Sequence, residues 1–357
     1  MYLKSLAVYH RCIRVSGHNF KKLFDIGGRP VGDGAPVLVI AEAGVSHFGD
    51  MDLARQLVQL ASDAGADAFK TQFFDVEALI AKVAPEWRER LRPRNLTLEH
   101  AHELKKMCEE LGLLFMATAH DETRIPWLKE LDVPAVKVGS GERNNPAFLK
   151  RLASLKKPMI VSTGMYREPD VIEAVEACAA GDCDRVALLH CVTSYPTPAS
   201  EVNLKAMDRL RELFPGPVGY SDHTADGVAV LAAVARGARI IEKHITILRD
   251  VPNAQDWKVS AGPENFGALV SDIRSVEALI GHGRKEPAPC EAAGGKWALK
   301  SLVAARDLPV GRVLTAADLI AKRPGDGLPP NQLDRVLGRS LKRALAADEP
   351  LAMDHLL

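Results

Sequence analysis

The sequence has no excess of charge of either sign. Lysine and arginine together number 46, as do aspartate and glutamate, so the formal net charge of the 357 residues is zero. Proteins that bind nucleic acid or a membrane surface depend on a basic excess for much of their affinity. The composition therefore argues against both kinds of partner.

Long apolar runs and paired cysteines are also missing. No apolar run reaches the roughly 18 residues that span a bilayer. His10, Arg11 and Arg14 interrupt the N-terminal stretch, so it has no signal-peptide core. We expect residues 1–22 to be an extension outside the fold. The six cysteines are scattered without a CxxC pair, which favours a reduced, cytoplasmic protein.

What the sequence does contain is a regular alternation of short and long apolar segments. Hydrophobic residues make up 47% of the chain, and its length suits one large and one small domain. The short β-rich runs lie at 37–41, 67–71, 114–118, 135–138, 159–162, 186–190, 217–221 and 239–244.

Between these runs lie segments with the spacing of amphipathic helices, such as 52–65 and 98–112. Gly65 and Gly112 stand where the helix ends are expected. Eight strands alternating with helices predict a closed (β/α)8 TIM barrel over residues 23–282. An open doubly wound sheet is the alternative, although no GxGxxG follows the first strand to support it.

The pattern stops after Ile280. Residues 283–297 are rich in glycine, proline, alanine and charge, which is typical of a linker. Residues 298–357 hold short strands and turns with little helix, which predicts a small, irregular β-rich domain.

Polar residues stand where nearly every predicted barrel strand ends, and the C-terminal strand ends are where such barrels carry their active sites. A lysine buried in a parallel strand costs several kcal/mol unless a counter-charge meets it. Two lysines at one barrel mouth, beside hydroxyl donors, predict a phosphate or carboxylate pocket. The strand-end residues are Glu42, Lys70, Gln72, Thr118, Lys137, Ser140, Glu142, Ser162, Thr193, Tyr195, Ser221, Asp222, His223, Glu242 and His244.

Two of these residues, His223 and His244, end adjacent strands and are expected to share one metal ion. Two imidazoles with Glu142 nearby and open water positions suit a divalent ion of the Mn, Zn or Fe type. The alternative is two unrelated core histidines. His190 and Cys191 are interpreted as structural.

The chain resembles the sialic acid synthase family of nonulosonic acid synthases. The matching motifs, in order, are IAEAGVSHFGD, GADAFKTQ, KVGSGE, PMIVSTGM, LLHCVTSYPTP, GYSDHT, IEKHIT and DWKVS. The tail motifs SLVA and KRPGDG resemble the antifreeze-like (SAF) domain that ends these enzymes. The resemblance covers residues 23–357.

This resemblance implies that phosphoenolpyruvate condenses with a 2-acetamido hexose, such as N-acetylmannosamine, to give a nine-carbon 2-keto-3-deoxy acid and phosphate. It implies Mn²⁺, or Mg²⁺, on His223 and His244, with Glu42 and Glu142 as further catalytic residues. The implied phosphoenolpyruvate contacts are Lys70, Thr118, Lys137, Ser140, Ser162 and Ser221. The implied sugar contacts are Gln72, Glu142, Tyr195, Asp256 and Arg323. Arg323 would reach the partner subunit's site in a domain-swapped homodimer.

Several positions depart from the family pattern. Ser46 and Phe48 flank His47 where asparagines are common, and Thr193 replaces an asparagine found in some members. The loop VPNAQDWKVS carries an extra residue and a tryptophan. These loops are expected to face the sugar, so the hexose stays open, and so does the placement of Asp256.

Two other functions compete with this prediction. A barrel that condenses phosphoenolpyruvate with a phosphorylated aldose would need an additional arginine cluster for the second phosphate. A non-catalytic sugar-binding protein would not need the complete set of ionisable residues at the strand ends.

Overall fold

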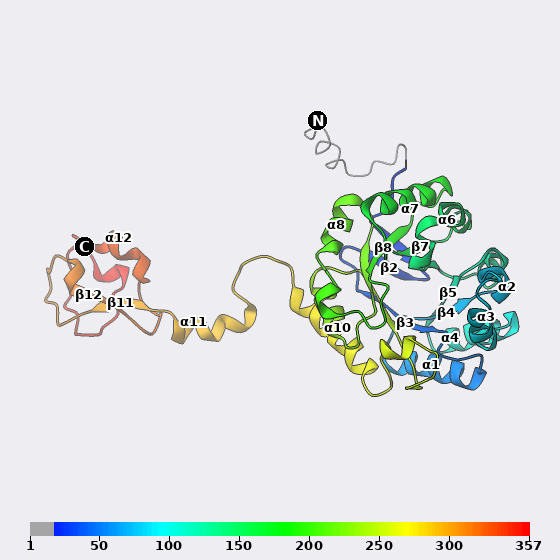
Figure 1. Cartoon of the computed structure of the whole chain (residues 1–357). Coiled ribbons are helices and arrows are strands. Elements are labelled where there is room, and N and C mark those ends of the chain that lie inside the picture. The colour runs from blue at the N-terminus through cyan, green and yellow to red at the C-terminus, as the bar shows by residue number, and fades with distance from the viewer. Residues whose placement is uncertain (1–17) are drawn as a thin grey trace. The chain divides into compact units, whose positions relative to one another are not determined.

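The computed structural model describes residues 18–357, and the chain divides after Gly281 into two compact units (Figure 1). No helix within the described residues is both long enough and apolar enough to cross a bilayer.

The first unit is built on a closed barrel of eight parallel strands, counted over residues 18–281. The barrel closes because β10 (Ile240–His244) pairs with β3 (Leu38–Gly44). The strands between them are β4 (Ala68–Phe73), β5 (Leu114–Ala119), β6 (Val136–Val138), β7 (Met159–Ser162), β8 (Val186–Cys191) and β9 (Val218–Asp222). The TIM barrel prediction is confirmed, and the open sheet is excluded.

Helices surround the barrel, as Figure 1 shows. They are α1 (Met51–Asp63), α2 (Val76–Leu79), α3 (Pro85–Leu91), α4 (Leu98–Glu110), α5 (Ile125–Glu130), α6 (Pro146–Ala153), α7 (Glu168–Ala180), α8 (Ala206–Leu213), α9 (Val228–Ala235) and α10 (Phe266–Ile280). The Asp50 side chain caps α1 by accepting from the amides of Asp52 and Leu53. Gly65 and Gly112 adopt φ of +75° and +72° just after α1 and α4, as a helix end with a left-handed residue requires.

Alternation along each strand separates two apolar layers. Outward side chains such as Val39 and Phe69 join one large cluster with the helices. Inward side chains such as Ile40, Met116 and Ile160 form a second cluster inside the barrel. Because successive side chains in a strand point to opposite faces, the next inward position on each strand lies toward its C-terminal end.

An antiparallel hairpin of β1 (Leu23–Ile26) and β2 (Arg29–Gly32) precedes the barrel. Its Phe24, Ile26 and Val31 belong to the inner apolar cluster. The N-terminal extension expected over residues 1–22 is wrong in its last part, because Phe20 is buried and its ring lies 5.2 Å from that of Phe214. Residues 1–17 lie outside the described part of the chain.

The second unit contains a two-stranded antiparallel sheet of β11 (Ser301–Ala304) and β12 (Leu319–Lys322). Two short helices accompany it, α11 (Ala292–Ala298) and α12 (Leu333–Val336). α11 falls largely within the segment expected to be a linker. Leucines dominate the core, and the buried Asp318 accepts hydrogen bonds from Arg306, Arg312 and Thr315. The expected small, β-rich domain is confirmed.

Candidate active site

Each of the eight barrel strands contributes one inward side chain with a polar head to a ring at its C-terminal end. Every member is buried and lines a common cavity of about 170 Å³. In strand order the ring comprises Glu42, Lys70, Thr118, Lys137, Ser162, Cys191, Ser221 and Glu242. Two cations and two carboxylates are thereby enclosed together.

Glu242 connects the two lysines. Its Oε2 lies 3.0 Å from Lys70 Nζ, and its Oε1 lies 3.4 Å from Lys137 Nζ. The Ser221 hydroxyl donates to Oε1 at 2.8 Å. Lys70 also meets Glu42 Oε2 at 3.1 Å. Each buried charge in the ring therefore has an opposite charge in contact, as burial requires.

The hydroxyl groups of the ring complete this network. Lys137 Nζ donates to Ser162 Oγ at 2.7 Å, and Lys70 Nζ donates to Thr118 Oγ1 at 3.3 Å. Ammonium groups and hydroxyls directed into one small cavity are suited to hold a phosphate or carboxylate.

The two carboxyl groups of the ring differ in pKa. Burial raises the pKa of Glu42 to about 7, although Lys70 opposes the shift. Burial would also raise the pKa of Glu242, but the ammonium groups of Lys137 and Lys70 lower it below its ordinary value. One carboxyl thus stays ionised near neutral pH while the other titrates, which is the pattern of an acid–base site.

His223 and His244 stand next to each other above the ring, with ring centroids 5.4 Å apart. Burial lowers the pKa of both imidazoles to about 4, so both are neutral near pH 7. His223 Nδ1 donates to the Val192 carbonyl at 2.7 Å, which leaves Nε2 as the acceptor for the Tyr195 hydroxyl at 2.9 Å. His244 Nδ1 is buried without a hydrogen-bond partner among the described residues.

These observations fit a divalent ion on the two histidines. Both imidazoles are neutral, and one buried ring nitrogen lacks a protein partner, which a metal or its water would supply. Glu142 does not join them, because within residues 18–357 no three or more His, Cys, Asp or Glu side chains gather as a metal cluster. Glu142 follows β6 in a 3-10 helix, Ser140–Asn144, and accepts from Asn145 Nδ2 at 2.8 Å. Its roles in catalysis and sugar binding stay predictions.

Three of the expected sugar contacts lie at the rim of the cavity. Gln72 donates to Glu42 Oε1 at 3.0 Å, and Tyr195 stacks on His223 with centroids 4.1 Å apart. A Cβ on Gly44 would lie 3.2 Å from Asp256 Oδ2 and 3.5 Å from Gln72 Nε2, so Asp256 is close to this rim.

Ser140, an expected phosphoenolpyruvate contact, lines the same cavity. Its hydroxyl accepts from the Gly164 amide at 2.9 Å. A Cβ on Gly164 would come within 2.7 Å of that hydroxyl and 2.4 Å of Thr193 Oγ1. The absence of a side chain at residue 164 is therefore needed for the two strand-end loops to meet.

Arg323 lies in the second unit, in the segment that follows β12. Its Nε donates to the Ala298 carbonyl at 3.0 Å, and its guanidinium stands 5.8 Å from the Trp297 ring centroid.

Three residues that line the cavity were not among the functional residues predicted from the sequence. Glu242 shares the inward face of its strand with His244, so period-two alternation was the signal for it. The same rule applies to Cys191, which was interpreted as structural but faces the cavity. His120 directly follows β5, and burial lowers its pKa to about 4.

Larger cavities, of about 620 and 650 Å³, are also present in the described residues. Residues of α7 and α8 line the first, and residues of α9 and the preceding loops line the second. Neither contains the buried lysines, so chemistry rather than volume identifies the site.

A parallel barrel with this ring, followed by a small β-rich unit, defines a two-domain barrel protein with an anion site at its strand ends. Residues 57–285 match the NeuB family, and residues 300–357 match the SAF domain. The chain belongs to the NeuB family, the family of nonulosonic acid synthases.

Known proteins resemble the chain over most of its length. The uncharacterized protein MJ1065 of Methanocaldococcus jannaschii is 39% identical over 332 residues, covering 93% of this chain and 98% of that protein. The N,N'-diacetyllegionaminic acid synthase of Legionella pneumophila is 37% identical over 347 residues, covering 92% and 97%. The crystal structure of the N-acetylneuraminic acid (sialic acid) synthetase of Leptospira borgpetersenii, in complex with citrate, superposes with a TM-score of 0.72 at 32% identity, covering 78% and 96%.

Proposed function

We propose that this protein condenses phosphoenolpyruvate with the aldehyde of a 2-acetamido hexose, giving a nine-carbon 2-keto-3-deoxy acid and inorganic phosphate. The observation that carries the proposal is the buried ring of Lys70, Lys137 and Glu242 at the strand ends of a NeuB-family barrel. Relatives named as legionaminic and sialic acid synthases support the same reaction class.

Phosphoenolpyruvate binds by its charged groups. Lys70 and Lys137, with the hydroxyls of Thr118, Ser140, Ser162 and Ser221, hold its phosphate and carboxylate. Because Glu42 titrates near pH 7, its protonation leaves two lysines facing one carboxylate, Glu242. The cavity then carries a net positive charge that matches an anion.

The histidines hold the divalent ion, for which Mn²⁺ is the first candidate and Mg²⁺ the second. When bound, the ion supplies Lewis acidity toward the aldehyde oxygen of the sugar. The Tyr195 hydroxyl donates to His223 Nε2 in this structure. With an ion on that nitrogen, the hydroxyl would be free to donate to the bound sugar. Gln72 and Asp256 orient the sugar, so that the C3 carbon of phosphoenolpyruvate faces its aldehyde carbon.

The bond changes follow from this placement. C3 of phosphoenolpyruvate attacks the aldehyde carbon, water adds at C2, and phosphate leaves by cleavage of the C2–O bond. Glu42, which has a pKa of about 7 and is protonated when phosphoenolpyruvate binds, is suited to give its proton to the aldehyde oxygen as the C–C bond forms and then, once ionised, to accept the proton of that water. Lys70 and Lys137 hold the phosphate and carboxylate throughout, which is electrostatic stabilisation in a buried site.

The candidate hexoses are N-acetylmannosamine, a 2,4-diacetamido sugar and a related precursor of a surface polysaccharide, since relatives named for all three kinds of product match the chain over most of its length. We further propose that the protein works as a domain-swapped homodimer in which Arg323 reaches the sugar in the partner's site. Its exposed position in the SAF domain supports this role.

The test is phosphate release from phosphoenolpyruvate by the full chain, stripped of metal and resupplied with Mn²⁺, across a panel of the candidate sugars. Release with one sugar, lost in His223→Ala and His244→Ala, is the expected result. His102→Ala, which removes an exposed histidine of α4, is the matched control and keeps full activity.

Two results would contradict the proposal. Release that persists without any divalent ion would remove the role of the histidines. A folded protein that binds neither Mn²⁺ nor phosphoenolpyruvate would exclude the reaction itself.

A further inference from the structure

A second buried ion pair lies directly behind the proposed site and takes no part in the chemistry above. Asp222 and Lys243 are 0% and 2% exposed, and they occupy paired register positions on β9 and β10. Alternation directs both side chains outward, whereas the neighbouring Ser221, Glu242 and His244 face the cavity. Each member of the pair immediately precedes one of the two histidines in the chain.

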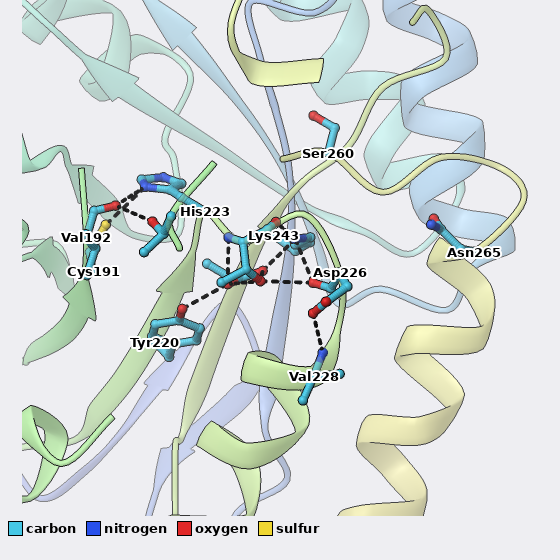
Figure 2. Close-up of polar contacts among 12 residues, drawn as sticks. Cys191, Val192, Tyr220, His223, Asp226, Val228, Lys243, Ser260 and Asn265 are labelled. Atoms are coloured by element: carbon cyan, nitrogen blue, oxygen red, sulfur yellow. Dashed lines mark hydrogen bonds and ion pairs between the residues drawn. The ribbon is translucent and has the colours of Figure 1, made fainter. Parts of the chain in front are cut away.

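The lysine uses all three of its hydrogen-bond donors on one short segment. Its Nζ donates to Asp222 Oδ2 at 2.5 Å, to the Thr224 carbonyl at 2.7 Å and to the Asp226 carbonyl at 3.2 Å (Figure 2). An ammonium group has three N–H bonds and no acceptor, so it is saturated here.

The aspartate is equally well satisfied. Its Oδ1 accepts from the Tyr220 hydroxyl at 2.9 Å and from the Thr224 amide at 3.1 Å. The Thr224 hydroxyl donates to the same carboxylate at 2.9 Å. Asp222 and Lys243 together therefore fix the chain on both sides of His223, from Tyr220 to Asp226.

His223 has little remaining freedom between these anchors. Its carbonyl accepts from the Thr197 amide at 2.8 Å, and its Nδ1 donates to the Val192 carbonyl at 2.7 Å. Figure 2 shows this imidazole and the Lys243 network on the same loop. The ion pair between Asp222 on β9 and Lys243 on β10 directly joins the two strands that lead into His223 and His244.

Stability alone does not require charges at these positions. A buried ion pair costs much of its attraction in lost hydration, and well-packed apolar residues often serve stability equally well. The ion pair also fixes the orientation of the chain around it, because an ammonium group with three fixed acceptors has one orientation.

We propose that Asp222 and Lys243 are positioning residues that set the spacing and orientation of His223 and His244. The inference rests on the proposed function, in which those histidines hold a divalent ion. It assigns to the pair a role in metal affinity that is separate from its role in folding.

The test compares Lys243→Met with Asp67→Asn in the full chain. Asp67 is a buried aspartate outside the site, and it accepts from Arg29, Arg274 and the Val39 amide. Both variants remove a charge from a buried, hydrogen-bonded side chain, so both are expected to have a lower Tm. Only Lys243→Met is expected to weaken Mn²⁺ binding, by about tenfold or more, because residues that orient a ligand have effects of that size.

Two further measurements read the geometry itself. The visible spectrum of bound Co²⁺ is expected to change in Lys243→Met and not in Asp67→Asn. Hydrogen exchange of the metal-free protein is expected to quicken over residues 222–226 in the same variant alone. Asp222→Asn, which keeps the side-chain volume, provides an independent variant if Lys243→Met fails to fold.

The outcomes separate the two proposals. If wild-type protein binds Mn²⁺ and a folded Lys243→Met or Asp222→Asn binds it within about twofold as tightly, the positioning role is refuted. If the wild type binds no Mn²⁺, the metal part of the proposed function fails. In that case exchange over 222–226 decides the positioning role: faster exchange supports it and unchanged exchange refutes it.

Discussion

Replacing Glu42 by glutamine should make the stability of the barrel less dependent on pH between about pH 5 and pH 8. The carboxyl group is 1% exposed, and it shares its nearest cation, Lys70, with Glu242. Burial raises its pKa from 4.5 to about 7. A carboxyl with a raised pKa contributes fully to stability below its unfolded value, and that contribution is lost as pH rises through the folded value.

The size of the effect follows from these two values. At roughly 1.4 kcal/mol per pKa unit, a rise from 4.5 to about 7 corresponds to about 3 kcal/mol once the group is ionised in both states. Roughly 2.5 kcal/mol of this contribution to the free energy of unfolding is lost as pH rises from about 5 to about 8. Glutamine keeps the shape but cannot ionise, so Glu42→Gln should not show this loss.

The assay is urea unfolding of metal-free protein at both pH values, followed by tryptophan fluorescence. Three of the four tryptophans, Trp87, Trp127 and Trp257, lie in the barrel unit. Subtracting the wild-type free energy of unfolding from that of the variant cancels the titrating groups that do not interact with Glu42. Glu173→Gln, at an exposed position on α7, should give a difference that does not vary with pH. If Glu42→Gln also gives a constant difference, the assignment of a raised pKa to Glu42 is wrong.

Four other changes test separate parts of the structure. Glu242→Gln leaves Lys70 and Lys137 without their shared carboxylate and should lower the free energy of unfolding by about 3–5 kcal/mol, whereas Ser221→Ala, measured in the same urea series, should cost less. Gly164→Ala should raise the KM for phosphoenolpyruvate about tenfold or more, because the new Cβ displaces Ser140; an unchanged KM in steady-state assays would argue against Ser140 as a contact. In the second unit, hydrogen bonds from Thr315 and Arg306 lower the pKa of Asp318 although burial opposes them. The stability of this unit should therefore fall as pH drops below the unfolded value of 3.8. Asp318→Asn should abolish that dependence in acid unfolding followed by circular dichroism. Mixing Arg323→Ala with His223→Ala subunits should restore up to about a quarter of wild-type activity if two chains share each site, and no restoration after verified exchange of subunits would contradict the sharing.

The barrel and most of its site could be predicted because both depend on local pattern. Runs such as VLVIA and VALLH gave the strands to within a few residues, and the inward polar positions follow from period-two alternation. Lys70 and Lys137 were informative because a lysine inside a parallel strand needs a partner. The partner itself, Glu242, was visible in the same pattern but was given no role.

Features that depend on turns or on distant contacts could not be predicted in this way. The 3-10 helix after β6, in which Glu142 accepts from Asn145, had no signal in the sequence pattern. The hairpin of β1 and β2 has only four residues per strand, too few for a clear period. The link between Asp222 and Lys243 joins two outward positions. Asp222 was noted as a strand-end residue, but the inward alternation that identifies cavity residues gives no signal for its partner Lys243.

The pairing of β3 with β10 has a consequence for synthesis of the chain. Lys70 and Lys137 leave the ribosome long before Glu242, which lies on the last barrel strand. Until that strand arrives, burying both ammonium groups would leave one of them without a counter-charge, at a cost of several kcal/mol. Burial of both lysines in a nascent barrel of seven strands would therefore carry this free-energy cost, which the carboxylate of Glu242 removes. The buried charges thus favour closure of the barrel only after its last strand has been made.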